Sequence, residues 1–228
     1  RRQRQMCIRD SFNSEVSYDA DGETPFRFGS FTTMGEFYVE TGLNIIGMSD
    51  YKRILSLDSA MAVVQFKKDH VVYQRNYFIS YPANVMVMRF SADQPGKQNL
   101  VFSYAPNPVS TGNMASDGNK GLVYSASLDN NGMKYVVRIQ AETKGGTLFN
   151  ADGKLTVKGA DEVVFYITAD TDYKPNFDPD FKDPKTYVGV NPEETTKEWM
   201  NNAVSQRYTA LFSQHYNDYA ALLSLIHI

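Results

Sequence analysis

Between residues 37 and 170, short apolar stretches alternate with polar residues and are separated by turn residues. This pattern is typical of an antiparallel β-sandwich. In the clearest stretch, residues 133–142, apolar side chains recur at every second position and only Val136 breaks the alternation. Because successive side chains of a strand point to opposite faces, the stretch predicts one face on a core and the other toward solvent.

Turn residues predict how neighbouring strands connect. Residues 130–132, Asn-Asn-Gly, tolerate positive φ and should join strands 122–128 and 133–142 in a hairpin. A second hairpin is predicted from residues 60–66 and 71–80. Further strands are expected at 85–91, 100–104, 147–149, 154–157 and 162–169. The segment 106–121 is rich in Ser, Asn and Gly without periodic apolar content, so we expect a surface loop there, open to a ligand or a neighbouring domain.

The pattern changes after the sandwich, which we place at residues 12–170. Residues 171–190 carry three prolines and many aspartates, and predict an extended connector. In residues 191–223, Asn191 offers a cap, Pro192 suits the first turn and Glu193 lies near the positive end of the helix dipole. Apolar residues then recur at helical spacing, which predicts one kinked helix or two consecutive helices.

Both ends of the chain differ in character from the rest. Residues 1–11 and 224–228 resemble translated sequencing-adapter sequence, so we predict that they are artefacts and leave them out of the fold. The alternative is a basic N-terminal arm and a fraying helix end. The one cysteine, Cys7, lies in the first of these segments, so no disulfide or thiolate metal site is expected in the remainder.

The length and the net charge of the chain limit the classes of function that it can have. The 228 residues suit one large domain, or one domain with an appendage. Without residues 1–11, which hold four Arg and one Asp, the formal charge changes from −3 to −6. No cluster of basic residues remains, so nucleic acid is not expected as a partner. No apolar run has the length of a membrane span, and no signal peptide is recognised.

Three stretches resemble the N-terminal domain of glycoside hydrolase family 95, which comprises α-L-fucosidases and related α-L-galactosidases. Residues 51–60, Tyr-Lys-Arg-Ile-Leu-Ser-Leu-Asp-Ser-Ala, are similar to the family's Y-x-R-x-L-D-L-x-x-A, with Ser56 in place of the usual aspartate. Residues 72–82 resemble the family strand that ends in Ser-Tyr-Pro, and the strand-like segment 85–93 follows. The connector and helices are similar to the family's link between its sandwich and its barrel.

The resemblance implies a mainly β fold: an antiparallel β super-sandwich followed by a connector and one or two C-terminal α-helices. It also implies a catalytic (α/α)₆ barrel, which we expect to be missing here, and an opening segment before Phe12 whose absence would leave sheet edges unpaired. Family members hydrolyse α-linked fucose with inversion at the anomeric carbon, using a glutamic acid as general acid and an activated water, both in the barrel.

None of the family's catalytic motifs maps onto this sequence. We therefore assign no catalytic, cofactor-binding or metal-ligating residue, expect no cofactor, and predict that the chain alone is inactive. The expected partners are the enzyme's own catalytic barrel and, for the full-length enzyme, a fucosylated glycan. The resemblance implies a periplasmic or extracellular location.

Several residues have side chains that could take part in catalysis or binding, but we prefer a structural role for each of them. His70 is expected in a turn and His215 in apolar packing rather than in chemistry. Arg53 and Arg75 are expected in ion pairs, and a sugar contact would need them at a concave end of the sandwich. The connector aspartates are interpreted as turn formers rather than as a calcium site: Asp170, Asp172, Asp178, Asp180 and Asp183. Aromatics that could stack on sugars are expected mainly in the core or an interface: Tyr18, Phe26, Phe28, Phe31, Tyr38 and Tyr104.

Two other functions remain open at this point. A free-standing carbohydrate-binding module would need only the sandwich, and the connector with its helices would then have no obvious purpose. The N-terminal domain of another (α/α)₆-barrel enzyme, a glycosidase, an α-L-galactosidase or a sugar phosphorylase, would share the same architecture.

Overall fold

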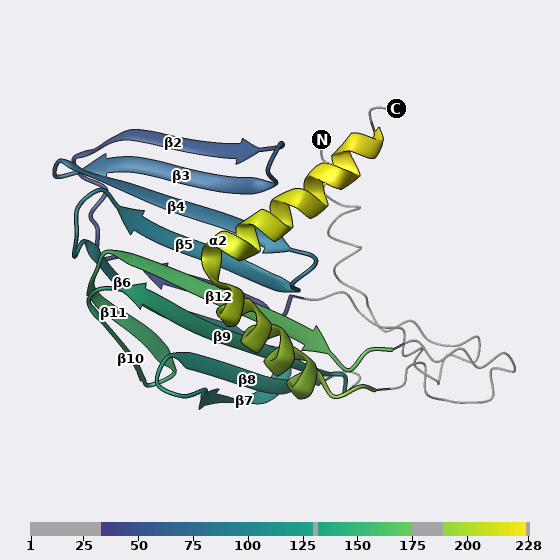
Figure 1. Cartoon of the computed structure of the whole chain (residues 1–228). Helices are drawn as coiled ribbons and strands as arrows, with labels where there is room; N and C mark the ends of the chain where they lie inside the picture. Colours follow the sequence, from purple (N-terminus) through teal and green to yellow (C-terminus); the bar gives the residue numbers. More distant parts are fainter. Residues whose placement is uncertain (1–32, 130–131, 175–188, 227–228) are drawn as a thin grey trace, which may run out of the picture.

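The computed structural model describes residues 33–129, 132–174 and 189–226 as two antiparallel sheets and a C-terminal helix (Figure 1). The four-stranded sheet has the order β1 (Gly35–Glu40), β6 (Gln98–Pro106), β11 (Lys154–Ala160), β10 (Thr147–Ala151). The eight-stranded sheet has the order β2 (Met48–Ser56), β3 (Met61–Lys68), β4 (Val71–Ser80), β5 (Val85–Ala92), β12 (Glu162–Thr171), β9 (Lys134–Lys144), β8 (Gly121–Leu128), β7 (Ser110–Ser116). The predicted mainly β sandwich is confirmed.

Both predicted hairpins are present. β8 pairs with β9 and β3 pairs with β4, each in antiparallel register. Asp69 and His70 join β3 to β4 with φ values of 50° and 64°. Two consecutive positive φ values belong to the type I′ turn, whose twist matches that of the flanking strands. The turn residues therefore set the register in which β3 and β4 meet.

The prediction of a loop at residues 106–121 is wrong, because this segment contains β7. Among the described strands, β7 forms one edge of the eight-stranded sheet and pairs only with β8. Apart from Met114, its side chains are small or polar and mostly exposed, so neither face carries the apolar alternation that reveals a half-buried strand. Gly112 is required by a close approach, since a Cβ there would lie 2.4 Å from the Cβ of Ala126.

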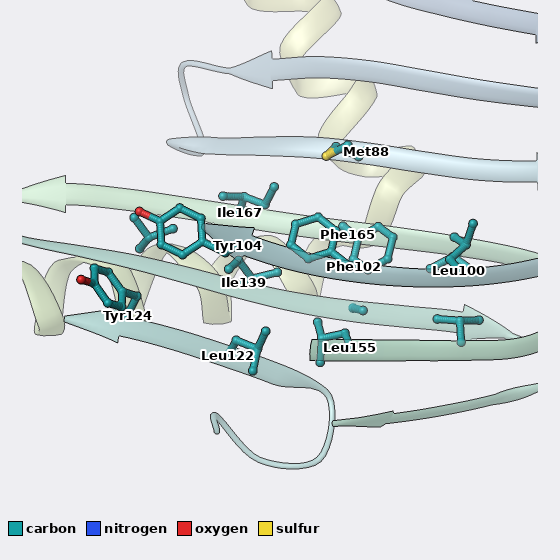
Figure 2. Packing of buried hydrophobic residues seen from close by; sticks show 14 of the residues in the cluster. Met88, Leu100, Phe102, Tyr104, Leu122, Tyr124, Ile139, Leu155, Phe165 and Ile167 are labelled. Carbon is teal, nitrogen blue, oxygen red and sulfur yellow. The ribbon is translucent and has the colours of Figure 1, made fainter. Parts of the chain in front are cut away.

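The main core lies between the two sheets (Figure 2). The Phe102 ring of β6 stacks on the Phe165 ring of β12 with centroids 4.6 Å apart. Leu122, Ile139 and Leu155 are fully buried around this pair. Burying each such side chain stabilises the fold by about 1.5–3 kcal/mol relative to exposure.

A second core lies on the opposite face of the eight-stranded sheet, beneath the helix α2 (Pro192–Ile226). The expectation that β9 turns one face to solvent is therefore wrong. Val136 is 2% exposed and Arg138 is 7% exposed on that face. α2 packs against β12 and β9, and Arg138 pairs with Asp117 at 2.5 Å. The apolar Val136 departs from the alternation because its face of the sheet is also covered.

α2 begins at Pro192 as predicted, with the Asn191 side chain accepting a hydrogen bond from the Glu193 amide at 3.1 Å. It consists of two helical segments that meet at Arg207, whose φ of 59° and ψ of 171° are not helical. This confirms the prediction of a kinked helix or two consecutive helices. The helix continues to Ile226, beyond the predicted end at residue 223.

Candidate functional site

A polar groove lies where the first turn of α2 meets β7, β8 and β9. The Ser125 hydroxyl of β8 donates to Glu193 Oε1 at 2.8 Å and so joins the sheet to the helix. The groove has a volume of about 310 Å³. Its polar lining residues are Thr111, Ser125, Ser127, Lys134, Asn191 and Glu193. Hydroxyls, an ammonium and a carboxylate could hydrogen-bond a polar ligand, but they do not form a nucleophile with its base.

A charged cluster fixes the kink of α2 to the sheet. Arg89 of β5 pairs with Glu162 of β12 at 2.5 Å, and its guanidinium lies 4.8 Å from the centre of the Tyr208 ring. The hydrogen bond to Glu162 raises the pKa of Arg89 above its ordinary value. Next to it, burial and then the Glu142 carboxylate raise the pKa of the Tyr166 phenol above 10.0. These contacts position the helix; they are not an arrangement for proton transfer.

The two histidines among the described residues, His70 and His215, lie in structural positions. His215 Nε2 lies 3.0 Å from the Ser59 carbonyl oxygen, and the His215 ring stacks on Phe78 at 5.0 Å. It therefore ties the second segment of α2 to the turn between β2 and β3. His70 is exposed in its turn. Both placements agree with the structural interpretations.

Arg53 and Arg75 lie on the same face of the eight-stranded sheet, each opposite Val64 in the register. The Arg75 guanidinium lies 5.1 Å from the Phe66 ring centre and 5.7 Å from that of Phe90. The expected ion pair is therefore replaced by two cation–π contacts for Arg75. Arg53 is exposed.

The remaining candidates do not converge on one place. Asp170 accepts a hydrogen bond from the Thr171 amide, and Asp172 accepts one from the Lys134 amide at 3.0 Å. Tyr104 is 7% exposed in the inter-sheet core, whereas Tyr38 is 48% exposed. The other aspartates and aromatics fall outside the described residues: Asp178, Asp180, Asp183, Tyr18, Phe26, Phe28 and Phe31. Within residues 33–129, 132–174 and 189–226, no group of three or more His, Cys, Asp and Glu could hold a metal ion.

Sequence reasoning missed both the polar groove and the Arg89 cluster. Arg89 and Glu162 are 73 residues apart in the chain, and only the pairing of β5 with β12 makes them neighbours. A usable signal was present, since Arg89 falls within the family-like segment 85–93 on a strand whose other residues are mostly apolar. A charge in such a strand needs a partner when it is partly buried.

Comparisons with known proteins locate this fold among carbohydrate-active enzymes. The sequence model described as "Glycosyl hydrolase family 65, N-terminal domain" matches residues 7–176. A probable alpha-fucosidase A of Aspergillus niger is 28% identical over 213 residues, covering 89% of this chain and 26% of the relative. Alpha-L-fucosidase 2 of Arabidopsis thaliana is 23% identical over 210 residues, covering 78% of this chain and 23% of the relative. The chain thus spans about a quarter of the length of these relatives.

A solved structure shows the same fold. A putative kojibiose phosphorylase from human microbiome superposes with a TM-score of 0.54 at 10% sequence identity, over 81% of this chain and 27% of that chain. Within the described residues, no helix has both the length and the apolar character needed to cross a membrane.

Proposed function

The chain belongs to the family of glycosyl hydrolase family 65 N-terminal domains, and from this premise we propose that it is the non-catalytic sandwich domain of an inverting α-L-fucosidase that acts on fucosylated glycans. Membership agrees with the glycoside hydrolase N-terminal domain that the motifs indicate, although the domain description carries the number 65 rather than 95. The observation that carries the proposal is the similarity to α-fucosidases along 78–93% of this chain.

We propose that the partner of the sandwich is the catalytic barrel of the same enzyme. α2 supports this role because it is fixed to the sheet at both of its segments, through Glu193 to β8 and through His215 to the turn after β2. A helix fixed at two points directs the chain that follows it along one path. The sandwich would then brace the barrel and supply no reacting group itself.

In the proposed enzyme, a carboxylic acid protonates the leaving oxygen while a second group activates a water on the other side of the sugar. The two groups of an inverting site stand about 6.5–9.5 Å apart to admit that water. Both would belong to the barrel. We also propose a periplasmic or extracellular location, where fucosylated glycans are accessible.

The test compares this chain with the product of the complete gene in its source DNA, which we propose is a longer protein. We expect the longer protein to release fucose from α-1,2-fucosylated glycans, and this chain alone to release none. Phosphorolysis of α-glucosides by the longer protein, with fucosides left intact, would identify a phosphorylase parent instead. Specific glycan binding by this chain, together with a natural gene that ends near residue 223, would support a binding module.

A further inference from the structure

The floor of the polar groove is a row of side chains on the face of the eight-stranded sheet that carries α2. Thr111 of β7 lies opposite Ser127 of β8, and Ser127 lies opposite Lys134 of β9. Ser127 alternates with Ala126 and Leu128, which point into the inter-sheet core, so the row points the other way. Figure 1 shows the first segment of α2 lying across β9 and β8 on this side. The first turn of α2 therefore forms one wall of the groove above a polar floor.

Two side chains of the floor have hydrogen-bonding groups that the fold does not use. Within residues 33–129, 132–174 and 189–226, the side chains of Ser127 and Lys134 make no hydrogen bond and no ion pair. The Lys134 ammonium can donate three hydrogen bonds, whereas the Ser127 hydroxyl can donate and accept. Ser127 is half-buried, so its hydroxyl has lost part of its contact with water. A ligand that supplies the missing partners would therefore be favoured over the empty floor.

The residues around Ser127 and Lys134 add further donors and acceptors. Ser125 donates to Glu193 Oε1 at 2.8 Å, which leaves Glu193 Oε2 able to accept. Thr111 donates to Asp129 Oδ1 at 2.9 Å, so Thr111 Oγ1 can still accept. Asn191 Oδ1 accepts from the Glu193 amide, so the side-chain NH2 group of Asn191 can donate. The groove thus presents both donors and acceptors, together with one positive and one negative charge.

This mixture indicates the chemical class of the ligand. An anion would be repelled by the Glu193 carboxylate, and a cation by the Lys134 ammonium. A neutral compound rich in hydroxyl groups suits both kinds of partner, since each hydroxyl can donate and accept. The volume of about 310 Å³ is at the lower end of the range for small-molecule sites. We propose that the groove binds one neutral sugar ring, at a site that takes no part in bond cleavage.

The source of the sugar ring follows from the proposed function, on which this step rests. If the chain is the sandwich domain of an enzyme that acts on fucosylated glycans, the ring belongs to such a glycan. Val136 and Pro192 also line the groove and can contact the C–H groups of the ring. A glycan held here at one unit has its other units at a raised effective concentration near the rest of the enzyme. The groove would then bind substrate without supplying a reacting group.

Saturation-transfer-difference NMR on the full 228-residue chain tests the proposal, with the α-1,2-linked disaccharide of fucose and galactose as the probe. We expect a Kd on the order of 1 mM, because a few hydrogen bonds at an accessible site bind weakly. Lys134→Met and Ser127→Val should each raise this Kd about tenfold, since each removes a hydrogen-bonding group from the floor. Lys144→Met is the matched control, because Lys144 is exposed at the other end of β9. It should leave the Kd unchanged.

Circular dichroism shows whether the variants fold. Lys134 is exposed and Ser127 is half-buried, so each variant should melt within about 2 °C of the unmodified chain. Three results would overturn the proposal: no saturation transfer to the disaccharide, equal weakening by Lys134→Met and Lys144→Met, or equal binding of N-acetylneuraminic acid, a sugar that carries a carboxylate.

The outcome is distinguishable from that of the proposed function. Fucose release by the complete gene product, with no binding of the disaccharide by this chain, refutes only the site in the groove. Binding that Lys134→Met and Ser127→Val weaken, with no fucose release by the complete gene product, refutes only the proposed enzyme activity.

Discussion

β12 and β2 belong to the same sheet but differ in almost every physical respect. β12 pairs with β5 and β9 and lies between the four-stranded sheet and α2, and six of its consecutive residues are buried. Within the part of the chain that the structure describes, β2 pairs only with β3, and seven of its consecutive residues are exposed. The difference teaches that burial in this domain is set by the layers above and below a strand. Membership of the sheet alone does not provide it.

The sequences of the two strands reflect their surroundings. β12 is apolar on both faces, with Phe165 directed to the inter-sheet core and Tyr166 to the core under α2. Strands covered on both faces characteristically show such continuous apolar runs. β2 carries Lys52 and Arg53 in its middle, as edge strands do when they avoid pairing with other chains. The half of the sheet around β12 is therefore the rigid support for α2.

The sharpest test of this contrast removes a side chain from β12, which is covered on both faces. Phe165→Ala should lower the free energy of unfolding by about 3–5 kcal/mol, because Phe165 is fully buried and stacks on Phe102. Urea unfolding followed by circular dichroism would measure the loss. Ile46→Ala, at a 74% exposed position, should change it by less than about 0.5 kcal/mol. Similar losses of unfolding free energy for both variants would contradict the difference in burial between β12 and the exposed part of the chain.

A smaller loss of stability is expected when the packing of α2 on β12 is weakened. Leu211 of α2 is fully buried in the core that includes Val164 and Tyr166 of β12. Leu211→Ala should therefore cost about 2–4 kcal/mol of unfolding free energy. Leu222→Ala is the control on the same helix, since Leu222 is 57% exposed. An unfolding curve that Leu211→Ala leaves unchanged would mean that α2 does not contribute to the stability of the sheet.

The same contrast explains which parts of the fold the sequence could predict. The inner face of β9 was predicted because its apolar residues alternate within one strand, and Val137 and Ile139 are fully buried as expected. Its outer face was misjudged, because Arg138 is a charged residue whose burial depends on α2 and Asp117, both distant in the chain. Local periodicity reports one layer of packing, and the second layer comes from tertiary contacts.

The candidate sites could likewise be predicted only where the signal lies within one segment of the chain. His215 was predicted as a packed residue from its apolar helical neighbours, and it contacts Phe78 and Ser59. The polar groove was not predicted, because Ser125 and Glu193 are 68 residues apart and each is unremarkable in its own segment. Sites of this kind arise only when strand register and helix docking are both known.

The smallest predicted effect concerns the backbone where α2 bends. Arg207 has φ of 59° and ψ of 171°, a region that is essentially reserved for glycine and costs other residues about 1–3 kcal/mol. Arg207→Gly should therefore stabilise the chain by about 1 kcal/mol and raise Tm by about 2–4 °C. Arg207→Ala is the matched control, because it removes the same side chain and keeps the strain. A lower Tm for Arg207→Gly than for Arg207→Ala would show that α2 does not bend at this residue. The segment of α2 that covers β12 would then end at another residue.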